Sequence, residues 1–227
     1  MKMKGGFLLN KLHNFLLLLL FTLFLGGCSF FSPEERIYQV LEQTVKKEED
    51  FEKQQKPLTQ IENKEKELFE QIMGLGIEEM EQIKKLADEA IEFTEEREAL
   101  LTKEHEAMKA SKKEFEKSEK YIKKLEDKEL QKEAKTLYKL MEKRFETHDE
   151  LYQVYNEGIK ADRKLYQLLK DKSLEYEQLE GQIKKTNKIY KNLFKVNDEF
   201  NKLTDKYNQG KIEFYKNAGM KIDESKK

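Results

Sequence analysis

The sequence predicts an all-α protein, an elongated antiparallel helical bundle or coiled coil of about four long helices. Ala, Glu, Lys, Leu and Arg make up 117 of the 227 residues, a share typical of long helices. The chain has only two prolines, so few positions interrupt a helix. Apolar residues recur at alternating spacings of three and four, which is the pattern of a helical seam. These three observations together favour a bundle of long helices over any compact mixed fold.

Composition also excludes several other classes of protein. No segment alternates at period two between turn residues, which argues against a Rossmann fold, a sandwich or a barrel. The single cysteine excludes a disulfide scaffold. Disorder is the competing explanation for a chain that is 39% charged, but an aromatic content of 11% gives helices apolar surface to bury. The helical interpretation is therefore preferred.

The first 27 residues are expected to form a lipoprotein signal peptide. Lys2, Lys4 and Lys11 provide a basic start without acidic residues, and an apolar run of 11 residues follows, from Phe15 to Leu25. A transmembrane helix would need about 20 apolar residues. The run is therefore too short to span a bilayer and has the length of a secretory signal.

The end of this run resembles a bacterial lipobox. Leu25, Gly26 and Gly27 are an aliphatic residue and two small residues, and they directly precede Cys28. The alternative is a stray cysteine beside an ordinary cleavage site. Because the chain's only cysteine lies at this point, we expect Cys28 to carry diacylglycerol and acyl chains such as palmitate, which anchor the protein stably in a membrane. No other cofactor and no metal ion is expected.

Cleavage would remove three lysines and no acids, leaving 41 basic and 45 acidic residues and a net charge of −4. A chain without excess positive charge gains nothing from counterion release, so nucleic acid is not expected as a partner. Residues 28–33 form a short tether, in which five extended residues span at most about 18 Å. The folded part would then be held close to the bilayer, with a serine and Pro33 at the start of its first helix.

The folded part, residues 34–218, is expected to contain four amphipathic helices, and residues 219–227 a polar tail. Gly74-Leu75-Gly76 gives the clearest break between helices. Pro57 is expected to kink or split the first helix. The break near 125–129 has no Gly or Pro and is left open. Helices of about 40 residues would be about 60 Å long.

Residues 170–173 form the polar interruption before the fourth helix, and Asp171 or Ser173 is expected to cap that helix. Polar residues on the apolar seams are expected to set the register of the helices rather than to bind a ligand. These seam residues are Thr44, Glu48, Gln55, Thr94, Arg144 and Asp162.

Catalytic chemistry has little support in the sequence. There is no glycine-rich phosphate loop after a strand, and the only thiol is assigned to the lipid anchor. His105 and His148 have no second ligand at helical spacing, so each is expected to be an ordinary helix histidine. The acidic residues are too numerous to single out a pair. We therefore expect a protein that is not an enzyme.

Tyrosines gather in the second half of the chain, and Tyr152, Tyr155 and Tyr166 are the candidates for ligand binding. A tyrosine ring can stack on a sugar while its hydroxyl bonds to a partner. The alternative, which helical spacing favours, is that these rings fill the seams and their hydroxyls reach solvent.

Several short segments along the chain form a recognisable set. They are Cys28 with Pro33-Glu34-Glu35-Arg36-Ile37-Tyr38, Gln54-Gln55-Lys56-Pro57-Leu58, Met73-Gly74-Leu75-Gly76, Ser111-Lys112-Lys113-Glu114-Phe115 and Leu165-Tyr166-Gln167-Leu168-Leu169. This set resembles the YkyA-type lipoproteins of Bacillus and its relatives, a family with a proposed cell-wall-binding role, over nearly the whole chain after the signal peptide. The resemblance implies a lipid-anchored envelope protein of a Gram-positive cell, and no catalytic residues.

The expected function is non-enzymatic binding at the outer face of the cell membrane. The partner would be peptidoglycan or another wall polymer. The alternative is a coiled-coil scaffold or adaptor that binds another envelope protein. The sequence leaves the ligand, the oligomeric state and the order of helices in the bundle open.

The Cys28→Ala variant tests the anchor. Without the thiol no lipid can be attached, so we expect the protein to leave the membrane fraction or to keep its signal peptide. Cell fractionation followed by N-terminal sequencing measures both results. Membrane retention with a normally cleaved N-terminus would refute the lipid anchor.

Overall fold

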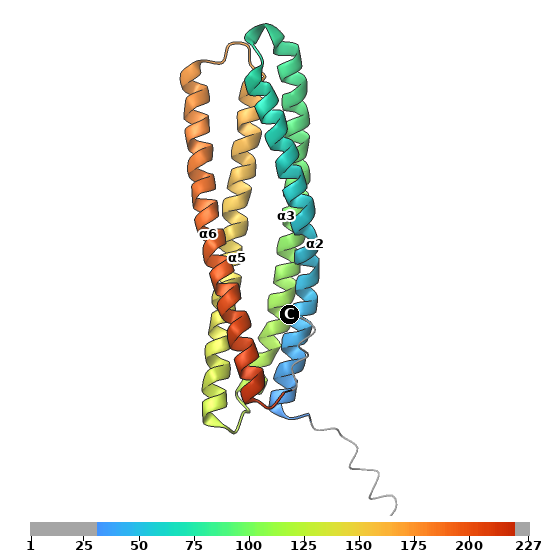
Figure 1. The fold of residues 1–227 in the computed structure, drawn as a ribbon, viewed down its shortest axis with the longest axis vertical. Coiled ribbons are helices and arrows are strands. Elements are labelled where there is room, and N and C mark those ends of the chain that lie inside the picture. Colours follow the sequence, from blue (N-terminus) through green and yellow to red (C-terminus); the bar gives the residue numbers. More distant parts are fainter. Residues whose placement is uncertain (1–30, 221–227) are drawn as a thin grey trace, which may run out of the picture. The chain divides into compact units, whose positions relative to one another are not determined.

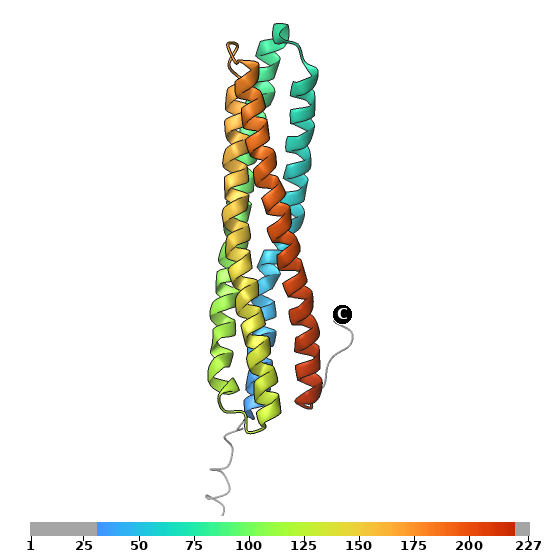
Figure 2. The same ribbon diagram turned by 90° about the vertical axis from the view of Figure 1, so that its left-hand side faces the viewer.

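A computed structural model describes residues 31–220, and in this range the protein is an antiparallel bundle of four long helices without strands (Figures 1 and 2). The predicted all-α bundle is therefore confirmed. The predicted signal peptide, lipobox and Cys28 lie outside the described residues. The four long helices are α2 (Pro33–Gly74), α3 (Met80–Phe115), α5 (Lys128–Leu169) and α6 (Tyr176–Asn217).

Short elements complete the second helical segment of the bundle. The 3-10 turn η2 (Ile77–Glu79) leads into α3, and η3 (Glu116–Ser118) with α4 (Glu119–Ile122) continues beyond it. The chain then turns before α5. Asp127 caps α5 by accepting hydrogen bonds from the backbone N–H groups of Glu129 (2.9 Å) and Leu130 (3.1 Å). A side-chain cap, and not Gly or Pro, makes the break that the sequence left open.

Two local expectations were wrong, namely a split of the first helix at Pro57 and a side-chain cap of the fourth helix, whereas a kink at Pro57 stays a prediction. α2 continues through Pro57 instead of being split there, and Leu58 and Ile61 just beyond the proline are buried in the bundle. Packing therefore holds the helix together where one backbone hydrogen bond is lost. Neither Asp171 nor Ser173 caps α6, whose N-cap residue is Glu175. Asp171 accepts hydrogen bonds from the backbone N–H and hydroxyl of Ser173 (2.8 and 2.7 Å), and α6 begins three residues later.

Apolar side chains form two core clusters along the bundle. One lies at the end where α2 begins and α6 finishes, and it includes Ile37, Phe115 and Phe214. The second lies towards the other end, around Ala87, Ala90 and Leu165. The rings of Tyr38 and Tyr215 pack with centroids 4.8 Å apart, so the start of α2 and the end of α6 meet. The described residues from Pro33 onward form a compact unit of their own, and a chain starting at Ser29 therefore contains this whole core.

Polar side chains inside the bundle join helices that are far apart in sequence. Arg144 of α5 donates two hydrogen bonds to the Glu48 carboxylate of α2 (2.8 and 2.9 Å) and one to the Thr204 hydroxyl of α6 (2.8 Å). This fork geometry is one that arginine makes and lysine cannot.

Within residues 31–220, no helix is both long enough and apolar enough to cross a membrane. The long helices are amphipathic rather than apolar all round, as the interspersed charged residues on their outer faces require.

Core packing in the first cluster can be tested with Phe115→Ala. The Phe115 side chain is 1% exposed, and we expect its truncation to lower the free energy of unfolding by about 3–5 kcal/mol. The matched control is Phe194→Ala, whose side chain is 70% exposed and should change stability by less than about 0.5 kcal/mol. Urea denaturation followed by circular dichroism measures both, and equal effects would contradict the packing described.

Candidate functional site

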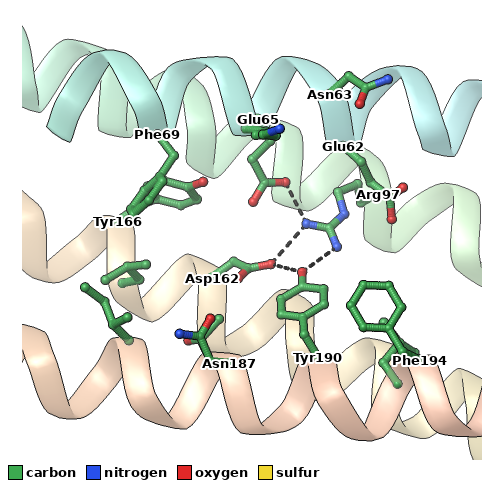
Figure 3. Close-up of a pocket in the computed structure, with 15 residues that line it drawn as sticks. Glu62, Asn63, Glu65, Phe69, Arg97, Asp162, Tyr166, Asn187, Tyr190 and Phe194 are labelled. Atoms are coloured by element: carbon green, nitrogen blue, oxygen red, sulfur yellow. Dashed lines mark hydrogen bonds and ion pairs between the residues drawn. The ribbon is translucent and has the colours of Figure 1, made fainter. Parts of the chain in front are cut away.

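A groove of about 570 Å³ runs along the side of the bundle, between α2 and α6, in the half remote from Pro33 (Figure 3). Close backbone packing joins α2 to α3, α3 to α5, and α5 to α6. α2 and α6 stand further apart, and the groove lies between them. The lining residues are Glu62, Asn63, Glu65, Lys66, Phe69, Arg97, Asp162, Leu165, Tyr166, Ile183, Thr186, Asn187, Tyr190, Leu193 and Phe194.

The floor of the groove is a buried network centred on Arg97 of α3. Its Nη1 donates to Glu65 Oε2 of α2 (2.7 Å) and to Asp162 Oδ2 of α5 (3.0 Å). Its Nη2 donates to Tyr190 Oη of α6 (2.9 Å), and the Tyr190 hydroxyl donates in turn to Asp162. One guanidinium therefore contacts all three other long helices.

Burial shifts the pKa values of the ionisable groups in this network. It raises the pKa of both Glu65 and Asp162, and the positive charge of Arg97 opposes that rise. Burial also raises the pKa of the Tyr190 phenol, which keeps its proton available for Asp162. Arg97 is 2% exposed, and its Nε has no hydrogen-bond partner among the described residues. The floor is thus polar and shielded from bulk water, and the charge of Arg97 is largely compensated by those of Glu65 and Asp162.

Aromatic rings and amides line the walls. Phe69 of α2 meets Tyr166 of α5 edge-on, with centroids 6.5 Å apart, and Phe194 of α6 is largely exposed beside the groove. Asn63 and Asn187 contribute side-chain amides from opposite walls. Flat apolar faces with nearby amides suit a sugar ring, whose faces are apolar and whose edge carries hydroxyls.

The structure separates the three candidate tyrosines. Tyr166 lines the groove. Tyr155 lies behind it, where its hydroxyl donates to Glu62 and its ring lies 5.2 Å from the guanidinium carbon of Arg97. Tyr152 is elsewhere, stacked on His105 with centroids 3.8 Å apart. The Tyr155 hydroxyl bonds to the half-buried Glu62 carboxylate, so the expectation that these hydroxyls reach solvent was wrong for Tyr155.

Sequence reasoning missed Arg97, Glu65, Tyr190 and Phe194. Arg97 follows Thr94 by three residues and precedes Leu101 by four, which is seam spacing, and this could have placed it inside. A second signal was available, because the chain uses 4 arginines among 44 basic residues. An arginine on a seam of a lysine-rich chain indicates a fork-shaped contact with carboxylates.

A second polar cluster lies outside the groove, between α3 and α5. It brings together His105, His148 and Asp149, whose ligand atoms lie within 4.8 Å of one another. Burial lowers the pKa of His105, and the nearby Lys109 and His148 act in the same direction. Spacing along a single helix showed no ligand pair for either histidine, because the partners come from two helices.

The fold and the groove define a class of protein, an all-α four-helix bundle with a lateral polar and aromatic groove. The family model described as "Putative cell-wall binding lipoprotein" (YkyA) matches residues 32–217. The chain belongs to this family.

One relative supports the assignment, and one solved structure shares the fold. Over 204 residues, the chain is 32% identical to the "Uncharacterized lipoprotein YkyA" of Bacillus subtilis (strain 168), covering 90% of this chain and 92% of that protein. A 1.6 Å crystal structure of a conserved protein of unknown function from Staphylococcus aureus superimposes with a TM-score of 0.60. That match covers 83% of this chain and 98% of the other at 19% identity, so it shows a shared fold alone.

The Arg97→Met variant tests the network under the groove. It leaves Glu65 and Asp162 buried without their cation, so we expect the free energy of unfolding to fall by about 3–5 kcal/mol at pH 7.5. The control is Arg163→Met, which breaks a pair with the half-exposed Glu98 and should cost less than about 1 kcal/mol. Urea denaturation measures both variants.

The loss in Arg97→Met should also depend on pH. The two carboxyl groups then have folded-state pKa values well above their unfolded ones, so the folded state binds more protons and gains stability as pH falls through the folded-state values. We expect the deficit relative to the unsubstituted protein to shrink between pH 7.5 and pH 5. A deficit that does not change with pH would refute the unpaired carboxylates as its cause.

Proposed function

We propose that this protein is a lipid-anchored, non-enzymatic binder of cell-wall polymer, held by Cys28 at the outer face of the cell membrane. The observation that carries the proposal is the groove between α2 and α6, with its aromatic and amide walls. Membership of a family of cell-wall-binding lipoproteins by description supports it. Non-enzymatic action is supported by the hydrogen bonds that engage the carboxyl groups of the groove, since Arg97 donates to Glu65 and Asp162, and Tyr155 donates to Glu62.

The charges at the groove favour a neutral or weakly charged glycan over an anionic polymer. Three acids, Glu62, Glu65 and Asp162, face two basic residues, Lys66 and Arg97. A polyphosphate would be repelled by this excess of carboxylates and would need far more cationic groups. The glycan strand of peptidoglycan, which offers sugar faces and amide-bearing substituents, fits the lining better.

The position of the groove suits an anchored protein. The residues of α2 that line it, Glu62 to Phe69, follow Pro33 by 29–36 residues, or roughly 44–54 Å along the helix axis. The lipid would be attached before Pro33 through a short tether. The groove would then be held at a distance from the membrane surface, and wall polymer is present at that distance.

An adaptor that binds another envelope protein is the second candidate. The observation that favours it is a pair of exposed apolar residues near the α2–α3 connection, Met73 (50% exposed) and Ile77 (60% exposed). In-cell crosslinking from position 77 would trap one protein reproducibly if this candidate is correct, and crosslinking from position 194 would then trap no wall fragment.

Sedimentation of a soluble chain starting at Ser29 with purified peptidoglycan tests wall binding. We expect Phe194→Ala to weaken binding by about tenfold, because an aromatic contact contributes about 1.5 kcal/mol. Tyr176→Ala is the matched control, since Tyr176 is an equally exposed aromatic residue of α6 (72% against 70%) outside the groove. It should bind as the unsubstituted chain does.

Two results would contradict the proposal. One is sedimentation no greater than that of an unrelated helical protein, and the other is equal weakening in both variants. Chromatography of the muropeptides after incubation measures cleavage, and the appearance of new products would refute non-enzymatic action.

A further inference from the structure

We propose that His105, His148 and Asp149 bind a divalent transition-metal ion of the zinc type between α3 and α5. The three side chains offer two imidazole nitrogens and one carboxylate oxygen, a ligand set that suits zinc and its neighbours in the first transition row. The cluster shares no residue with the groove, so this proposal is independent of wall binding.

The spacing of the ligand atoms fits a metal after a small adjustment. They lie within 4.8 Å of one another, with His105 Nδ1 and Asp149 Oδ1 3.8 Å apart. Tetrahedral zinc with bonds of about 2.1 Å holds its ligand atoms about 3.4 Å apart. The longest separation therefore has to close by up to about 1.4 Å, and rotation of the Asp149 side chain, which is 47% exposed, can supply part of that movement.

Two buried nitrogen atoms lack partners at this place. His105 and His148 are 7% and 2% exposed, and the Nδ1 atom of each has no hydrogen-bond partner among the described residues. A buried polar atom without a partner is costly. A shared metal ion would satisfy both nitrogens at once.

The surrounding residues resemble the outer shell of a metal site. His148 Nε2 lies 3.3 Å from Glu104 Oε1, and Gln55 donates to the other oxygen of Glu104 at 3.0 Å. With its Nε2–H directed at Glu104, His148 has a lone pair free on Nδ1. This carboxylate–imidazole arrangement is the one that usually orients a metal-binding histidine.

Ring contacts hold both imidazoles in place. The His105 ring stacks on Tyr152, with planes 5° apart, and lies nearly parallel to the His148 ring, with centroids 5.8 Å apart. His148 also packs between Phe51 and Phe200, at 5.6 and 5.5 Å. Preorganised ligands lose little freedom on binding a metal. The exposed side of Asp149 leaves a path for the ion and a position for a water ligand.

The chain starting at Ser29 gives a clean test, because it contains no cysteine and only these two histidines. With any affinity tag removed, titration with Zn²⁺ should show one equivalent bound, and Co²⁺ should produce the strong visible absorption of a tetrahedral site. Binding to the folded state should raise the melting temperature, and a chelator should reverse the rise.

Variants assign the ligands. Asp149→Asn changes a partly exposed residue and should leave helicity and melting temperature in the absence of metal unchanged while weakening Zn²⁺ binding by about tenfold or more. His105→Gln should abolish the Co²⁺ spectrum. Asp198→Asn is the matched control, since Asp198 is an exposed carboxylate of α6, paired with Lys202, outside the cluster. It should bind Zn²⁺ as the unsubstituted chain does.

The proposal is overturned by the absence of saturable binding at micromolar Zn²⁺, or by binding that Asp149→Asn and Asp198→Asn affect equally. Loss of the spectrum in His105→Gln supports it only if circular dichroism shows a folded variant, and the Asp149→Asn result decides the matter if that variant unfolds.

Discussion

Arg97 places a positive charge inside the bundle, and the other three long helices are arranged so that each supplies a hydrogen-bond acceptor to it. A buried guanidinium is tolerated when its donors find acceptors, and here α2 supplies Glu65, α5 supplies Asp162 and α6 supplies the Tyr190 hydroxyl. Sliding any of these helices by one turn would move its acceptor by about 5.4 Å and leave charges unpaired. We therefore interpret Arg97 as the residue that fixes the register of the four helices. It also forms the floor of the groove, so the position of the groove along the bundle follows from the same interaction.

A second arginine repeats this arrangement nearer the other end of the bundle. Arg144 projects from α5 and joins Glu48 of α2 to Thr204 of α6, whereas Arg97 projects from α3. An aromatic ring packs over each guanidinium, Phe200 over Arg144 at 4.8 Å and Tyr155 over Arg97 at 5.2 Å, but Arg97 also lines a groove. Charged contacts thus specify register in both halves, and the groove between α2 and α6 lies in the half that contains Arg97.

Most of the fold could be predicted from the sequence, because long helices are determined by local pattern. The spacing of apolar residues and the break at Gly74–Gly76 led to four helices in the positions that the structure shows. The Asp127 cap and the continuity of α2 at Pro57 depend on single contacts and on packing, and periodicity does not report these. The groove could not be predicted from the sequence, because it arises where α2 and α6 diverge. The cluster of His105 and His148 was missed for a related reason, because its members come from different helices and no spacing along one helix reveals them.

The position of the groove relative to Pro33 has a mechanical consequence. A polymer held between α2 and α6, with a lipid holding the chain ahead of Pro33, would pull α2 lengthwise against its neighbours. In that direction the contacts between α2 and α3 are loaded in shear, so they bear the force together. Under a force perpendicular to the helices they would break one after another. The two long helices, of 42 and 36 residues, would then act as a tension-bearing link between two surfaces, with a resistance to pulling that grows with the length of their contact.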